Sequence, residues 1–298
     1  MSKPKIGFLG LGLMGSAMVG RLQDQGYDLT VLGNRNRTGL DAAVARGAAE
    51  VHTGREVAEA SDIVMLCMGT SDHVEARMRG DDGIIAGLSE GKVVIDFGTS
   101  LPASTKALGA EVAAKGAAML DGPLGRTPAH AKDGLLNIMA AGDKDVFDRV
   151  EPVLQDLGEN VFHLGALGAG HTVKLLNNFF GMTQAHAMCE AFAVADMAGI
   201  PRQQLYDVVS AGPLRSGMMD FVKAYAVEGN ANMLEFSVRN ARKDVGYYAA
   251  MAESLGVESL MVTGARQALG MSMAKGRGET MVSEQVDFFT ELFSEDKG

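Results

Sequence analysis

The sequence predicts an α/β protein in which a doubly wound parallel sheet is followed by an all-helical second domain. Three observations support this fold class. A glycine-rich turn follows the first apolar run, short apolar strands alternate with helices as far as about residue 164, and from about residue 168 the pattern is helical only. A chain of 298 residues is long enough for two domains, which we place at 1–164 and 165–298.

The first element is an apolar strand at 6–9, followed by glycines with the spacing G-x-G-x-x-G and then a helical pattern. Gly10 allows a tight turn, Gly12 lets the backbone approach a pyrophosphate, and Gly15 lets the helix pack close to the sheet. The free N–H groups of the helix N-terminus attract the phosphates. The turn is therefore typical of a Rossmann dinucleotide-binding domain; the alternative is a glycine-rich turn that binds nothing. The neighbouring residues Leu11, Leu13 and Met14 are expected to contact the cofactor as well.

The next elements alternate in the same way. Strands are predicted at 28–32, 62–67, 93–97, 117–121, 136–140 and 161–164, where the last two complete the sheet, and helices at 40–46, from 53 and from 102. The helical half begins with a long apolar helix at 171–197, which we expect to be buried between other helices. Further helices are predicted at 203–210, 217–227, 235–254, 259–273 and 283–293.

Composition excludes several classes of function. The net charge of −10 gives no electrostatic support for binding nucleic acid, and no apolar stretch is long enough for a transmembrane helix. Cys67 and Cys189 are too few for a disulfide framework or a zinc site, so we expect no metal and a reduced cytosolic setting.

The segment after the second strand indicates which dinucleotide is bound. A site that prefers NAD usually has an acidic residue here to accept a hydrogen bond from the ribose 2′-hydroxyl. This chain has Asn34, Arg35 and Arg37 instead, and guanidinium groups suit a 2′-phosphate. We therefore predict a preference for NADP; the alternative is that the arginines are solvated loop charges. Met68 lies in the loop after another strand, at the sheet edge that binds ligands, and is expected near the cofactor.

A second polar cluster follows the strand at 117–121. Gly125 leaves backbone N–H groups accessible, Arg126 adds a planar fork of donors and Thr127 adds a hydroxyl. Together they suit an anion such as a carboxylate or a sulfonate. The alternative is a structural turn with a surface arginine.

Two further clusters lie in the helical half. Lys174 and Asn178 are four residues apart, so both side chains lie on one face of the long helix, whereas Asn177 points about 100° away. A half-buried lysine beside a nucleotide can pass a proton to a carbonyl oxygen, although a surface lysine is the alternative. The pair Lys243–Asp244 on a late helix is, from spacing alone, an exposed ion pair.

Taken together, these motifs resemble the β-hydroxyacid dehydrogenase family. The resemblance rests on four stretches in the family's order: 7–15, 121–127 with Gly134, 168–178 and 243–244. It implies a Rossmann domain, a helical domain built on the long helix, and a nicotinamide cofactor. It gives Lys174 the acid/base role and Asn178 the orientation of the substrate. It also implies that Lys243 lies beside the cofactor or substrate and that Thr99 meets the nicotinamide end of the cofactor.

The chain departs from the family pattern at three places. The usual substrate motif has Ser-Gly-Gly where this chain has 125–127, a variant similar to that of sulfolactaldehyde reductases, in which the arginine side faces a sulfonate. The arginine equally suits another terminal anion. Gly98 replaces a serine before Thr99, and Asn34 and Arg35 replace the acidic residue of NAD-dependent members.

We therefore predict a cytosolic, NADP(H)-preferring oxidoreductase, with NAD(H) as a second cofactor, that interconverts a short anionic semialdehyde and its 3- or 4-hydroxy acid. A sulfolactaldehyde reductase is one alternative, and a nucleotide-binding regulatory protein without turnover is an alternative of another class. The expected partners are a small anionic substrate and, because the helical half is rich in apolar residues, copies of the same chain in a homodimer or homotetramer. Neither nucleic acid nor a membrane is an expected partner.

Overall fold

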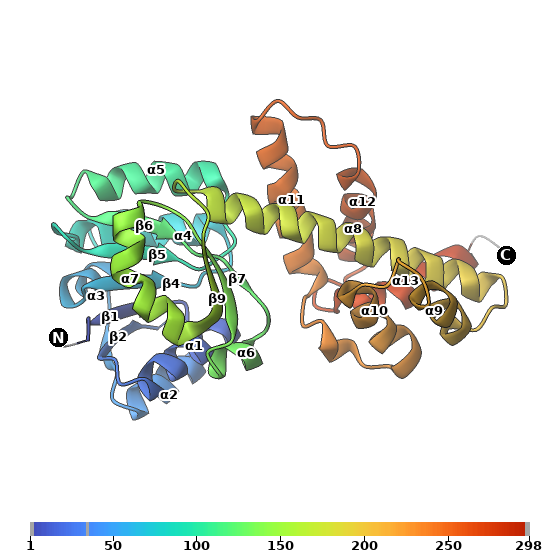
Figure 1. The fold of residues 1–298 in the computed structure, drawn as a ribbon, viewed down its shortest axis with the longest axis horizontal. Helices are drawn as coiled ribbons and strands as arrows, with labels where there is room; N and C mark the ends of the chain where they lie inside the picture. Colours follow the sequence, from blue (N-terminus) through green and yellow to red (C-terminus); the bar gives the residue numbers. More distant parts are fainter. Residues whose placement is uncertain (1–2, 34–35, 296–298) are drawn as a thin grey trace. The chain divides into compact units, whose positions relative to one another are not determined.

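The computed structural model describes residues 3–33 and 36–295, and the chain forms two compact units, Met1–Lys174 and Leu175–Gly298. Figure 1 shows the first as a sheet with covering helices and the second as helices only. The prediction of an α/β fold followed by a helical part is confirmed. Among the described helices, none is long and apolar enough to cross a membrane.

The main sheet of the first unit is six-stranded and entirely parallel, in the order β3-β2-β1-β4-β5-β6. Its strands are β1 (Ile6–Leu9), β2 (Leu29–Leu32), β3 (Ala49–Val51), β4 (Ile63–Leu66), β5 (Val93–Asp96) and β6 (Ala118–Asp121). The strands β1, β4 and β5 are buried along their whole length, because helices cover both faces. The strand order reverses between β1 and β4, and doubly wound sheets bind ligands at the carboxyl edge beside such a reversal.

Two apolar cores lie on opposite faces of this sheet. One core takes alternate residues such as Ile6 and Phe8 and packs against helices α1 (Leu13–Asp24), α2 (Thr38–Ala45), α6 (Pro128–Lys132) and α7 (Lys144–Leu157). The other core takes Leu9 and Leu32 and packs against α3 (Gly54–Ala60), α4 (Ser71–Met78), the short 3₁₀ helix at Ile84–Gly87, and α5 (Pro102–Ala113). In Figure 1, α5 and α1 lie on opposite sides of the strands.

The prediction that the strands at 136–140 and 161–164 complete the main sheet is wrong. They form a second sheet in which β8 (Leu136–Ala140) lies between β7 (Leu124–Gly125) and β9 (Gly158–His163). The β7–β8 pairing is antiparallel and the β8–β9 pairing is parallel. A physical reason lies at the junction after β6, where Pro123 has no N–H with which to extend a ladder. Asp121 instead exchanges both backbone hydrogen bonds with Ala141, at 3.1 and 2.7 Å, and so joins the two sheets.

The second unit is built on α8 (Ala169–Met197), which begins in the first unit. The other helices are α9 (Arg202–Ser210), α10 (Gly217–Glu228), α11 (Val238–Ser254), α12 (Val262–Ala274) and α13 (Gln285–Glu295), with short 3₁₀ helices at Ala231–Met233 and Val282–Glu284. The core contains fully buried Phe192 of α8. The expectation that α8 is buried all round is wrong, because Phe180 and Val194 are 63% and 53% exposed in this chain.

Candidate active site

Of the three glycines in the turn after β1, two are required by the fold and one is not. Gly10 has a φ of +96°, and a Cβ at Gly15 would lie 1.9 Å from the Gly10 carbonyl oxygen, so both positions exclude a side chain. A Cβ at Gly12 would meet nothing within 4 Å. Gly12 is also the N-cap of α1, and no side chain caps that helix. The open space and the uncapped N–H groups fit a dinucleotide pyrophosphate.

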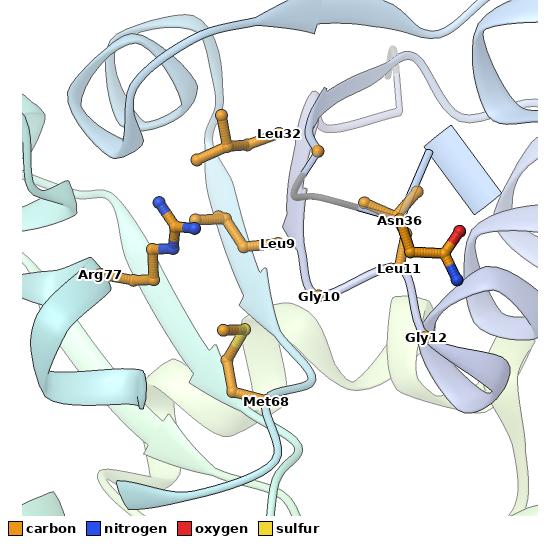
Figure 2. Close-up of a pocket in the computed structure, with 9 residues that line it drawn as sticks. Leu9, Gly10, Leu11, Gly12, Leu32, Asn36, Met68 and Arg77 are labelled. Atoms are coloured by element: carbon orange, nitrogen blue, oxygen red, sulfur yellow. The ribbon is translucent and has the colours of Figure 1, made fainter. Parts of the chain in front are cut away.

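A pocket of about 230 Å³ adjoins this turn in the first unit (Figure 2). It is lined by Leu9, Gly10, Leu11, Gly12, Leu32, Gly33, Asn36, Met68 and Arg77. The lining therefore combines the glycine turn with the end of β2, the region that holds the adenosine half of a dinucleotide in Rossmann domains. Leu11 and Met68, which the sequence singled out, line this pocket, whereas Leu13 is 82% exposed and Met14 packs against the core.

Of the cations that the sequence places near this pocket, the structure describes Arg37. Asn34 and Arg35 lie outside the described residues. Arg37 is engaged with two carboxylates, because its two Nη atoms lie 3.0 Å from the carboxylate oxygens of Glu50 and it also pairs with Asp41. The hydrogen bonds from Arg37 lower the pKa of Glu50 below its ordinary value.

Arg77 was missed by the sequence analysis, although it is the charged residue that lines the pocket. Figure 2 shows its side chain extending from α4 toward Leu9, on the opposite side of the pocket from Asn36. No hydrogen bond or ion pair to another described residue is made by its guanidinium. A helix predicted at 71–78, directly after the Met68 loop, could have indicated Arg77, because α4 starts at the ligand edge of the sheet.

The end of β5 shapes the loop that carries Thr99. Asp96 is 1% exposed, and its two carboxylate oxygens accept hydrogen bonds at 2.8 Å from the Gly98 N–H and the Ser100 hydroxyl. The loop is thereby fixed at the carboxyl edge of the sheet, where Thr99 is expected to meet the nicotinamide. Gly98, which replaces the family's serine, would place a Cβ only 3.0 Å from an Asp96 oxygen.

The end of β6 holds the start of α8. Asp121 is fully buried, and its two oxygens each accept a hydrogen bond of 2.7 Å, from the backbone N–H groups of Gly168 and His171. Burial raises the pKa of the Asp121 carboxyl, while the nearby His171 and these two donors oppose the rise. Gly170 allows this close approach, because a Cβ there would lie 2.1 Å from the Met139 carbonyl oxygen.

Lys174 follows one turn later on α8 and is half-buried. Asn178, one further turn along the same face, is 8% exposed, and its Nδ2 donates to Asp244 Oδ2 at 2.6 Å. Asn177 is exposed and donates to the Asn178 side-chain oxygen at 3.1 Å. The helix therefore carries a lysine and a buried, oriented amide on one face.

The second unit brings Lys243 and Asp244 to the same amide. Asp244 is 2% exposed, and the Lys243 Nζ lies 3.0 Å from its Oδ1, so the interpretation of this pair as an exposed ion pair is wrong. Asp244 is thus bonded to Asn178 through one oxygen and paired with Lys243 through the other. The sequence singled out both clusters but could not join them, because 66 residues separate Asn178 from Asp244.

The anion-binding candidates lie at the end of β7. Among the described residues, Arg126 is the one non-glycine with a positive φ, at +77°. Its Nη1 donates to the Leu135 carbonyl oxygen at 2.7 Å and pairs with Glu159 at 2.5 Å. The hydroxyl of Thr127 lies 2.8 Å from His130 Nδ1, and a Cβ at Gly125 would lie 3.2 Å from that of Asn137. A non-glycine residue in the left-handed region is often a sign of a functional constraint.

Comparison with known proteins agrees with this geometry. Residues 5–165 match the NAD-binding domain of 6-phosphogluconate dehydrogenase, and residues 168–289 match the NAD-binding domain of NADP-dependent 3-hydroxyisobutyrate dehydrogenase. A 3-sulfolactaldehyde reductase of Escherichia coli is 30% identical, over 94% of this chain and 95% of its own. A probable mitochondrial 3-hydroxyisobutyrate dehydrogenase-like protein of Arabidopsis thaliana is 32% identical over 73% of this chain and 68% of its own.

A solved 3-hydroxyisobutyrate dehydrogenase from Salmonella typhimurium superimposes with a TM-score of 0.82 and 26% identity, covering 96% of this chain and 100% of the other. The two family models together span almost the whole sequence, one on each side of the start of α8. The chain therefore belongs to the 3-hydroxyisobutyrate dehydrogenase family, that is, to the β-hydroxyacid dehydrogenases, and is an NAD(P)-dependent oxidoreductase.

Proposed function

We propose that this enzyme interconverts a short anionic semialdehyde and its 3- or 4-hydroxy acid, with NADP(H) as the preferred cofactor and Lys174 as general acid/base. The observation that carries the proposal is the common helical face of Lys174 and Asn178, beginning one turn after the N–H groups that Asp121 fixes. The motif resemblance supports the same roles.

The residues divide the work as follows. The nicotinamide, when bound, supplies or accepts the hydride. As negative charge develops on the substrate carbonyl oxygen, the Lys174 ammonium gives it a proton, and the amine takes that proton back in the reverse direction. Asn178 has a second amide N–H beside the one donated to Asp244, and this N–H orients the reacting end. Arg126 and Thr127 hold the far anion of the substrate.

The chemistry of that far anion separates two candidate functions. The Gly125–Arg126–Thr127 variant and the reductase relative at 30% identity favour a sulfonate, whereas an arginine binds a carboxylate equally well. A panel of sulfolactaldehyde, succinic semialdehyde and tartronate semialdehyde, followed by NADPH oxidation, ranks them by kcat/KM. No turnover of any aldehyde in the panel would favour a nucleotide-binding regulatory protein instead.

Replacing Arg126 with glycine is expected to raise KM for the best anionic aldehyde about 10- to 100-fold with little change in kcat, because a hydrogen bond to a charged group contributes ~1.5–3 kcal/mol. Glycine also suits the positive φ at this position, so the variant is expected to fold normally. Arg126→Lys, which keeps the charge, is the matched control and should lose less affinity. An unchanged KM in Arg126→Gly would place the anion elsewhere.

Two arginines are expected to act on different parts of the cofactor. The pocket lined by Leu9, Leu32 and Arg77 suits an adenine ring stacked on a guanidinium, a contact of ~0.5–2 kcal/mol, so Arg77→Ala should weaken NADPH and NADH equally, by about 3- to 30-fold. Arg35→Ala should weaken only NADPH, if Arg35 holds the 2′-phosphate. Dissociation constants of both cofactors for both variants test this, and selective loss of NADPH in Arg77→Ala would contradict the stacking role.

A further inference from the structure

Glu50 is an acidic residue bonded to Arg37, which the sequence singles out as a ligand of the 2′-phosphate of NADP. Arg37 directly follows Asn36, one of the residues that line the cofactor pocket. Both Nη atoms of Arg37 donate to the Glu50 carboxylate at 3.0 Å, and its Nε donates to Asp41 at 3.1 Å. All three nitrogens of the guanidinium group are therefore bonded to carboxylates of the chain itself.

The strand register places Glu50 beneath the start of α2. Glu50 lies on the edge strand β3 opposite Val31 of β2, and paired residues of parallel strands point to the same face of a sheet. Val31 is fully buried in the core that α2 covers, whereas Val51, the next residue on β3, packs against the other core. Arg37 is the N-cap residue of α2, so the Glu50 carboxylate meets it at the start of that helix. The position of Glu50 is thus set by the sheet.

The pair competes with a phosphate for the same donors. The two parallel N–H donors of an arginine fit a carboxylate and a phosphate equally well, and Glu50 already occupies them. One guanidinium and two carboxylates leave this group with a net charge of −1. A phosphate monoester carries about −1.5 to −2 at neutral pH, so it can pair with Arg37 only after Glu50 releases the guanidinium. The uncharged 2′-hydroxyl of NADH meets no such competition.

We propose that Glu50 is a specificity-determining residue for the cofactor: it withholds the Arg37 guanidinium from the 2′-phosphate and so limits the preference for NADP(H) over NAD(H). The inference rests on the proposed preference for NADP(H) in one respect, the position of the 2′-phosphate beside the start of α2. In the unmodified protein, Arg37 then serves mainly to tie α2 to the edge strand β3.

Dissociation constants of NADPH and NADH, measured by titrating the fluorescence of the reduced cofactor, test this role in Glu50→Gln. The amide keeps the size of the side chain but loses the charge that holds the guanidinium. We expect the dissociation constant of NADPH to fall about 5- to 20-fold and that of NADH to change less than about twofold. A variant with a loosened fold would bind both cofactors more weakly. An unchanged affinity for NADPH, with normal NADH binding, would overturn the proposal.

Asp41→Asn is the matched control. It removes the same charge beside the same guanidinium but leaves the two-point pair with Glu50, so NADPH should bind less than about threefold more tightly. An equal gain in Asp41→Asn and Glu50→Gln would show a general effect of negative charge and would contradict the release of Arg37.

A double-mutant cycle identifies Arg37 as the group that is released. When Glu50→Gln is added to Arg37→Ala, the dissociation constant of NADPH should change less than about twofold, because no guanidinium remains to be freed. A full gain in that background would mean that Glu50 repels the phosphate directly, and the proposed route through Arg37 would be wrong.

The same titrations separate this inference from the proposed function. If the unmodified protein binds NADH more tightly than NADPH, the proposed preference fails, while the role of Glu50 is still decided by the change that Glu50→Gln produces. If the unmodified protein prefers NADPH and Glu50→Gln leaves both affinities unchanged, the preference stands and the role of Glu50 is wrong.

Discussion

Replacing Lys174 with alanine is expected to lower kcat by about 10²- to 10⁴-fold, the range usual for removing a positioned acid/base group. Binding of NADPH should change little, because the features that fit the cofactor are the glycine turn and the pocket beside it. Titration of NADPH fluorescence and steady-state assays on the best aldehyde measure the two effects separately.

Leu176→Ala is the matched control for Lys174→Ala, since Leu176 is 47% exposed on the same helix and lies about 200° around it from Lys174. It should keep kcat within a few-fold. If Lys174→Ala turns over near the normal rate, the redox role assigned to this helix face is wrong. If it also loses NADPH affinity, the lysine contributes to cofactor binding as well as to proton transfer.

The substitutions Gly12→Ala and Gly15→Ala are expected to have different effects. The first should weaken NADPH binding, and the second should lower the stability of the fold. At Gly15 the new Cβ would lie 1.9 Å from the Gly10 carbonyl oxygen, so α1 must move, at a cost of ~3 kcal/mol or more in the free energy of unfolding. At Gly12 the new Cβ meets no protein atom within 4 Å, so stability should change by less than ~1 kcal/mol. The same methyl group would obstruct the pyrophosphate and raise the NADPH dissociation constant about 10-fold or more.

Chemical denaturation and NADPH titration of both variants give the two readouts. Gly217→Ala is a suitable control, because Gly217 also lies at the start of a helix and its Cβ would meet nothing within 4 Å, but it lies in the second unit. Unchanged NADPH affinity in Gly12→Ala would show that the pyrophosphate does not approach this glycine. An equal loss of stability in both variants would contradict the prediction that the added Cβ is too close to the backbone at Gly15 but not at Gly12.

Periodicity predicted most of the fold, because alternation of short apolar strands with helices leaves few arrangements other than a doubly wound sheet. It failed where a single residue changes the pairing. The run at 136–140 is as apolar as the central strands, but Pro123 interrupts the ladder beforehand, and β7 is only two residues long. The two-residue strand β7 exists because β8 pairs with it, and no local sequence pattern indicates this pairing.

The candidate site was predictable only as separate pieces. Motif spacing marked Lys174, Asn178 and the glycine turn, since each depends on neighbours a few residues away. The pairing of Asn178 with Asp244, and of His171 with Asp121, joins residues 50 or more positions apart. Arg77 was missed for a related reason: whether an arginine faces a pocket or solvent depends on the strand packed beside its helix.

Two of the helix N-termini in the first unit, those of α8 and α1, are occupied differently, and the difference indicates where each anion binds. The start of α8 is filled by a carboxylate of the chain itself, Asp121, whose negative charge already complements the helix dipole. The start of α1 has no capping side chain and remains open at Gly12. The polyanion of the cofactor is therefore drawn to one helix, while the substrate's single charge must be recognised by side chains. Simple phosphates should compete with the dinucleotide rather than with the aldehyde.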